Sequence, residues 1–173
     1  MKILYVSLLA MILGDLTASG QQQKDRKEIL QLIEKYSAAV ISRDSVTFYE
    51  LFNNGQVTWA GSLSQRSQAK EIESGKSTSS SAYFMGSYQQ FMRGLFKYSS
   101  TEDKFDNIQI TTDGTVASVT MDYSFWANRK MTNWGGKYLG LIKKEGRWKI
   151  TSVIYSLDLT KYFKRTAVAS RKN

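Results

Sequence analysis

Any chemistry in this chain must run on carboxylates, tyrosines, lysines or arginines, because the sequence contains no histidine and no cysteine. Imidazole is the usual general base near neutral pH and a common metal ligand, and a thiolate is an alternative nucleophile and ligand. Their absence excludes thiol catalysis and disulfides, and it removes the ligands of most zinc, copper and non-haem iron sites. We therefore expect neither a metal nor another cofactor.

Asp122 is the one acidic residue in the middle of a predicted central strand, residues 115–127. If the sheet turned this carboxyl inward, an apolar pocket would raise its pKa and make it a general acid or base. By strand alternation, however, it shares a face with Ser118, Thr120 and Ser124. We assign that polar face to solvent or to a subunit interface, so Asp122 is a weak catalytic candidate.

A set of strands must position these groups. Apolar and polar residues alternate along the segment 115–127, and short turns at Asp113-Gly114 and Glu145-Gly146 favour hairpins. The segments with strand patterns are 56–63, 105–112, 115–127, 136–144 and 147–159. The pattern predicts a curved, largely antiparallel sheet.

Apolar residues recur at helical spacing in several segments of the first 100 residues. A helix is predicted over 24–42, with its apolar face formed by Ile29, Ile33, Tyr36 and Val40. Asp44 is placed to cap a second short helix, whose Phe48, Leu51 and Phe52 face the core. A polar stretch follows over 64–81, with a helical turn near 69–73 and a Ser/Thr-rich loop at 77–81. The third helix is expected over 82–98, burying Phe84, Tyr88, Phe91, Met92 and Leu95.

Together these elements predict an α+β fold, a cone-shaped half-barrel in which a strongly bent sheet wraps around about three helices. The interior would be apolar and aromatic, which suits a flat or hydrophobic ligand, unless the side chains fill the cone completely. The expected lining residues from strands are Trp59, Met121, Tyr123, Phe125 and Trp148.

The N-terminus resembles a secretory leader, with Lys2, an apolar run over 3–13 and the small residues Ala18-Ser19-Gly20 before a cleavage point. We expect residues 1–20 to be a signal peptide, 21–160 one domain, and 161–173 a basic tail. The protein would then be exported, to the periplasm or the medium. Its net charge of +9 fits weak contact with anionic envelope surfaces better than nucleic acid in that location.

Three landmarks in order point to a known family: Ile33–Ala39 on the first helix, Arg43-Asp44 followed by Tyr49–Phe52, and the closing hairpin 138–150. The chain resembles the nuclear transport factor 2-like superfamily, which includes SnoaL-like cyclases, steroid delta-isomerases and scytalone dehydratase. The resemblance implies a cone with a pocket at its wide end. It also implies a homodimer formed through the outer sheet face.

The resemblance covers residues 25–158, so the residues that an isomerase mechanism needs can be compared with this chain. The oxyanion tyrosine of the steroid isomerases falls on Tyr36, but the positions of their two aspartates fall at or beside Trp59 and near Leu139, whose side chains cannot move a proton or hold an enolate. We therefore expect an interior without any strand-borne ionisable group, and a non-catalytic pocket for a small hydrophobic or aromatic molecule. The alternative is a cofactor-free SnoaL-like isomerase, cyclase or dehydratase, with Tyr36 as oxyanion donor and Asp122 as acid or base.

Overall fold

A computed structural model of the chain describes residues 3–77 and 82–165, with side chains from residue 20 onward. The expected loop at 77–81 and the end of the basic tail therefore lie largely outside the described residues. Within them no helix is long and apolar enough to cross a membrane.

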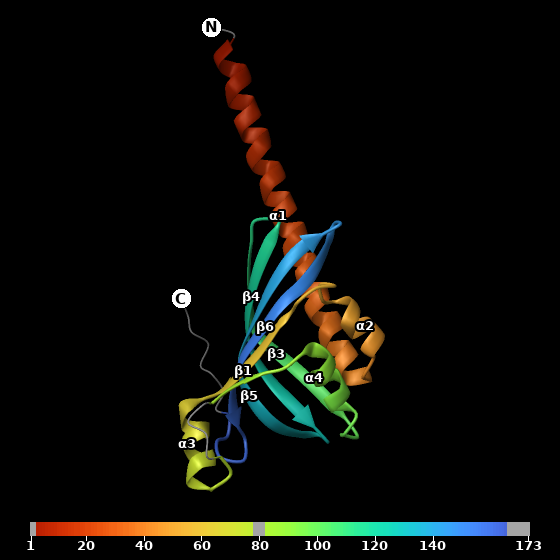
Figure 1. The fold of residues 1–173 in the computed structure, drawn as a ribbon. Helices are drawn as coiled ribbons and strands as arrows, with labels where there is room; N and C mark the ends of the chain where they lie inside the picture. Colours follow the sequence, from red (N-terminus) through yellow and green to blue (C-terminus); the bar gives the residue numbers. More distant parts are fainter. Residues whose placement is uncertain (1–2, 78–81, 166–173) are drawn as a thin grey trace.

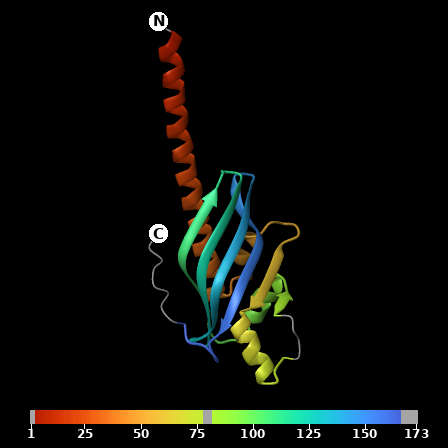
Figure 2. The same ribbon diagram turned by 90° about the vertical axis from the view of Figure 1, so that its left-hand side faces the viewer.

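A single mixed sheet of six strands forms the body of the fold, in the order β2-β1-β6-β5-β4-β3. All neighbours are antiparallel except β1 and β6, which run parallel. Figures 1 and 2 show the sheet strongly curved, with one face turned toward helices. The strands are β1 (Thr58–Leu63), β2 (Tyr83–Met85), β3 (Thr101–Thr112), β4 (Val116–Ala127), β5 (Lys130–Lys144) and β6 (Arg147–Leu159).

The curvature coincides with three irregularities in strand pairing. The register shifts between Asp106 and Gln109 on β3, between Phe125 and Trp126 on β4, and at Gly140 on β5. An extra residue in one strand bends it and increases its twist. The sheet can therefore wrap around the helices, and the predicted α+β half-barrel is confirmed.

Helix α1 (Ile3–Ser42) crosses the concave face with its C-terminal half, while its N-terminal half projects beyond the domain (Figure 1). The predicted apolar stripe of α1 is buried, with Ile29, Ile33, Tyr36 and Val40 each 3% exposed or less. Asp44 caps α2 (Ser45–Glu50) as predicted, because its carboxylate accepts from the backbone N–H groups of Val46 and Thr47. The polar stretch after β1 contains a longer helix than expected, α3 (Gln65–Glu73), capped by Ser64.

The single third helix predicted over 82–98 is wrong. Tyr83–Met85 instead pair with β1 as the edge strand β2, and Phe84 is 40% exposed. Ser87 then starts the shorter helix α4 (Tyr88–Leu95) through a reciprocal capping box with Gln90. Helix α4 still buries Met92 and Leu95, and it closes the concave side together with α1 and α2.

Candidate functional site

The C-terminal half of α1 is fixed against the first residues of β3, and this contact positions the candidate site. The Ser37 hydroxyl donates to the Asp103 carbonyl at 2.8 Å, and the Thr101 hydroxyl donates to the Val40 carbonyl at 2.8 Å. Tyr36 is the residue before Ser37 on α1. The Tyr36 ring lies over the inner side of β3, with its centroid 5.7 Å from that of Phe105.

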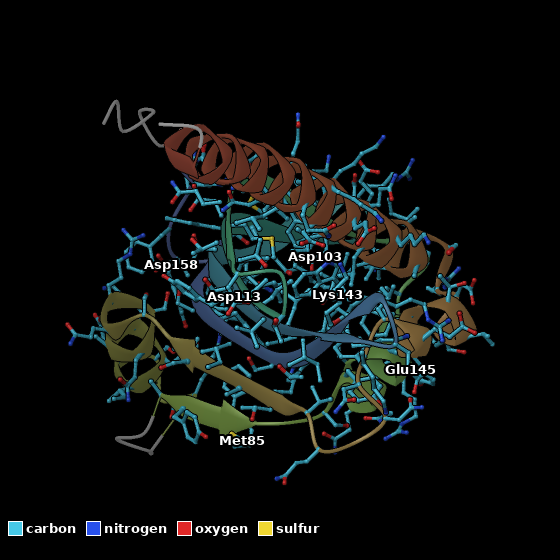
Figure 3. The ribbon with its side chains drawn as sticks, turned by 90° about the horizontal axis from the view of Figure 1, so that it is seen from above. Met85, Asp103, Asp113, Lys143, Glu145 and Asp158 are labelled. Carbon is cyan, nitrogen blue, oxygen red and sulfur yellow. The ribbon has the colours of Figure 1, made fainter. Side chains whose placement is uncertain are left out.

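A buried ion pair joins two strands inside the cone. Lys137 of β5 donates its Nζ hydrogen to Asp103 Oδ2 of β3, and the two side chains are 5% and 1% exposed. Three aromatic rings surround the ammonium group. Nζ lies 4.5 Å from the centroid of Tyr123, 5.0 Å from that of Phe105 and 5.3 Å from that of Tyr36. Figure 3 shows Asp103 enclosed between α1 and the strands.

Burial shifts the pKa of every ionisable group in this cluster toward its neutral form. It raises the pKa of Asp103, although the charge and hydrogen bond of Lys137 oppose the shift. It lowers the pKa of Lys137, against the opposing effect of Asp103. Burial, and then the nearby Asp103 charge, raise the pKa values of Tyr36 and Tyr123 well above the ordinary tyrosine value.

Two polar atoms of the cluster have no hydrogen-bonding partner among the residues that the structure describes. They are Tyr36 Oη and Asp103 Oδ1, and both are buried. Tyr123 differs, because its hydroxyl lies 3.0 Å from both the Asn133 side-chain oxygen and the Ser156 carbonyl. A buried polar group without a partner costs about 1–3 kcal/mol of stability, so these two atoms are suited to form hydrogen bonds with a polar group of a ligand.

The expectation of an interior without a strand-borne ionisable group is therefore wrong. Asp103 and Lys137 both project from strands among the interior rings, and each is less than a tenth exposed. Trp59 and Leu139, the two positions that the resemblance compared with catalytic aspartates, are buried apolar residues as the sequence indicates. The interior carboxylate comes from β3 instead.

The residues predicted to bind a ligand do not all lie together. Tyr36 and Tyr123 flank the ion pair, whereas Trp59 lies farther along the core, with its ring centroid 5.0 Å from that of Phe91. Trp148 lies beside Lys143 and lines a surface groove of about 580 Å³ between α1, α2 and the β5–β6 turn. Of the remaining two, Met121 is buried and Phe125 is half-buried; the centroid of the Phe125 ring is 6.1 Å from that of Phe91.

Asp122 lies on the outer face of the sheet, in the polar row that alternation assigns to it. Its carboxylate accepts a hydrogen bond from the Asn107 amide at 2.6 Å, and it lines a shallow hollow of about 200 Å³ with Gly136 and Ser156. It does not share the interior with Tyr36. In the part of the chain that the structure describes, no three carboxylates gather closely enough to hold a metal ion.

No protein-family model matches the chain, and no curated protein matches it in sequence. Solved structures do match its fold. A proposed scytalone dehydratase from Novosphingobium aromaticivorans aligns with a TM-score of 0.62 at 14% identity, covering 90% of this chain and 99% of its own. A nuclear transport factor 2-like protein of unknown function from Pseudomonas putida aligns with a TM-score of 0.58 at 12% identity, covering 85% and 97%.

A nuclear transport factor 2-like protein with a cystatin-like fold, also from Novosphingobium aromaticivorans, aligns with a TM-score of 0.58 at 15% identity over 84% of this chain and 89% of its own. At these identities the likeness concerns the fold alone. The fold of this chain is the nuclear transport factor 2-like, or cystatin-like, α+β fold.

Proposed function

We propose that this protein binds a small, mostly apolar molecule inside the cone, and that Asp103, Lys137 and Tyr36 hold one polar group of that molecule. The observation that carries the proposal is the pair of buried polar atoms without partners, Tyr36 Oη and Asp103 Oδ1, beside a buried ammonium group. A ligand hydroxyl could donate to Asp103 and accept from Tyr36. The surrounding rings would contact the rest of a flat ligand.

Access to this cluster requires movement, because Asp103 and Lys137 have almost no exposed surface. We place the entrance beneath α4. Its Phe91 is half-buried and lies between the rings of Trp59 and Phe125, at centroid distances of 5.0 and 6.1 Å. Displacement of this ring is the movement that we propose admits the ligand.

The binding proposal is tested first by native mass spectrometry of protein purified gently from its own host, where a retained ligand appears as extra mass. The second measurement is titration with 2-naphthol, a flat fluorescent probe that carries one hydroxyl. We expect Tyr36→Phe and Asp103→Asn to weaken probe binding about tenfold each, which is the effect of losing one hydrogen bond of about 1.4 kcal/mol.

Tyr138→Phe is the matched control, because Tyr138 is 51% exposed on the outer face of the sheet. This variant should bind the probe as the wild type does. The proposal fails if the purified protein carries no extra mass and does not bind the probe, or if Tyr36→Phe binds it as tightly as Tyr138→Phe does.

A second candidate function is proton transfer on a bound substrate, and the same cluster supports it. Asp103 has a raised pKa and could act as acid or base, while Tyr36 could donate a hydrogen bond to a developing oxyanion. The role that the sequence suggested for Asp122 would then belong to Asp103. An Asp103→Asn variant that retains a ligand but loses turnover would favour this enzyme, whereas unchanged turnover would exclude it.

For the whole chain we propose export after removal of residues 1–20, and pairing of two copies through the outer sheet face. The cross-strand neighbours Tyr138 and Ile154 support the pairing, because they are 51% and 48% exposed at the middle of that face. Tyr138→Ser combined with Ile154→Ser should convert a dimer to a monomer in analytical ultracentrifugation. A wild-type monomer at high concentration would exclude the pairing.

A further inference from the structure

One end of the molecule combines exposed apolar side chains with cations that have no acidic partner. We call it the basic end and define it by Ile41, Arg93, Phe96, Lys97, Arg129 and Lys130. It lies opposite the projecting half of α1, where α1 finishes and the β4–β5 turn begins (Figure 1). Phe96 is 60% exposed and Ile41 is 53% exposed.

The three segments of the basic end are tied to one another. Arg43, just after α1, donates to the Tyr98 carbonyl at 2.8 Å, and its guanidinium carbon lies 5.8 Å from the Phe96 ring centroid. The side chain of Asn128, in the β4–β5 turn, accepts from the Ser99 backbone N–H at 2.8 Å. These contacts hold the end of α1, the segment after α4 and the β4–β5 turn in one surface.

The cations of this surface are directed outward. Arg93, Lys97, Arg129 and Lys130 are all exposed, and none forms an ion pair with a residue that the structure describes. Arg93 of α4, its C-cap Phe96 and the following residue Lys97 have the i, i+3, i+4 spacing that puts side chains on one helix face, and the Lys97 N–H still donates to the Gly94 carbonyl in the turn after α4. Cations therefore flank an exposed aromatic ring.

Backbone conformation adds a second observation. Asn128 and Arg129 both adopt positive φ angles, 51° and 62°, at the tip of the β4–β5 hairpin. Such a turn favours glycine at its second central position, and a long side chain there is unfavourable. The conformation places the Arg129 guanidinium at the tip, beside a groove of about 440 Å³ that Ile41, Lys104 and Trp126 also line.

We propose that the basic end binds the surface of an anionic lipid bilayer. Lysine and arginine side chains near such a surface contribute attraction to anionic headgroups, while exposed aromatic and aliphatic side chains enter the boundary between headgroups and acyl chains. Phe96 and Ile41 are the inserting groups, and Lys97, Arg129 and Lys130 are exposed cations of the same three segments. The surface is separate from the interior ligand site.

The test is sedimentation of the full chain with phosphatidylcholine vesicles, prepared with and without phosphatidylglycerol, at an ionic strength of about 0.15 M. The test variant reverses three cations of the basic end: Lys97→Glu, Arg129→Glu and Lys130→Glu. The control variant reverses three exposed cations elsewhere, Lys27→Glu, Lys76→Glu and Lys164→Glu, which changes the net charge equally. Both variants keep the apolar N-terminal segment, so its contribution cancels.

We expect the test variant to lose about a hundredfold or more in binding to anionic vesicles, and the control variant to lose much less. Phe96→Ser should weaken binding about tenfold without any change of charge, because a partly exposed ring can no longer insert. Equal losses in the two triple variants would overturn the proposal, since affinity would then follow net charge alone. Binding to soluble polyuronate but not to vesicles would overturn it as well.

Discussion

Two lysine–aspartate pairs anchor the same strand, β5, and they lie in opposite environments. Lys137 pairs with Asp103 among aromatic rings, where both side chains are 5% exposed or less. Lys143, six residues along β5, pairs with Asp25 of α1 and lies 3.6 Å from Glu28. Lys143 is the second-last residue of β5, so it lies at the end of that strand.

The pKa values of the two aspartates shift in opposite directions, although each aspartate pairs with a lysine. Burial raises the pKa of Asp103, and its one lysine does not reverse the shift. Burial would also raise the pKa of Asp25, but hydrogen bonds from Lys143 and from Gln21 outweigh it and lower the pKa. Asp25 itself has no exposed surface, yet Lys143 is 18% exposed and remains in contact with water.

The difference indicates different roles for the two pairs. An ion pair at the rim satisfies its charges and holds α1 against the sheet. A sealed pair with an unpartnered carboxylate oxygen is a poor way to gain stability, because desolvation of two charges opposes their attraction. We propose that the interior pair serves ligand binding rather than folding.

The largest expected effect is on stability after Lys137→Met. This change leaves the Asp103 carboxylate buried without its cation, and loss of one partner of a buried pair costs about 3–5 kcal/mol. The double variant Lys137→Met with Asp103→Leu should recover most of that loss, because no charge then remains to be desolvated. Urea unfolding at pH 7 measures all three free energies of unfolding.

The rim pair is the comparison for that experiment. Lys143→Met should cost much less than Lys137→Met, because Asp25 keeps both hydrogen bonds from the Gln21 amide, whereas Asp103 Oδ1 has no partner among the described residues. If Lys137→Met and Lys143→Met cost the same, burial does not distinguish the two pairs as we argue. Failure of the double variant to recover stability would show that Lys137 acts by packing rather than by charge.

The next effect is a dependence on pH with opposite sign at the two aspartates. The folded pKa of Asp25 is lowered from 3.8, so its carboxylate stabilises the fold above that pH, and this contribution is lost as the pH falls through 3.8 toward the folded pKa. The difference in unfolding free energy between the wild type and Asp25→Asn should therefore shrink on acidification.

Asp103 should show the reverse. Its folded pKa is raised from 3.8, so the folded state retains the proton longer, and ionisation destabilises the fold as the pH rises through that window. The wild type should lose stability relative to Asp103→Asn as the pH rises above 3.8, by at most about 1.4 kcal/mol per pH unit. Urea unfolding at a series of pH values from about 3 to about 7 measures both slopes. Slopes of the same sign would contradict the assignment.

The fold was largely readable from the sequence, because local signals agreed with it. Asp44 begins a helix as its position predicts, and burial alternates along β4 from Val116 to Tyr123. The prediction of a single helix over 82–98 was wrong, although the aromatic residues of this segment have helical spacing. Pairing of Tyr83–Met85 with β1 depends on residues some 20 positions away, and no local pattern shows that pairing.

The site was harder to predict, for two separate reasons. Lys137 carried a usable signal, since it is in step with Leu139 and Leu141 on a strand whose inner face is apolar. Asp103 did not, because β3 begins at Thr101 rather than 105 and contains a bulge after Asp106. The bulge reverses the alternation, so extending the phase of Ile108 and Ile110 backward places Asp103 on the wrong face.

The smallest expected effect concerns salt, which should weaken the rim pair but not the interior pair. Lys143 is partly exposed, so mobile ions should screen its attraction to Asp25 and Glu28, and the loss of stability caused by Lys143→Met should be smaller in about 1 M NaCl than at low salt. The loss caused by Lys137→Met should be nearly the same at both salt concentrations, because ions cannot reach Asp103. Unfolding free energies of the wild type and the two variants at low and high salt provide the comparison. A strong salt dependence at Lys137 would mean that water and ions enter the cone in the native state, and the ligand site would then be open before any ligand arrives.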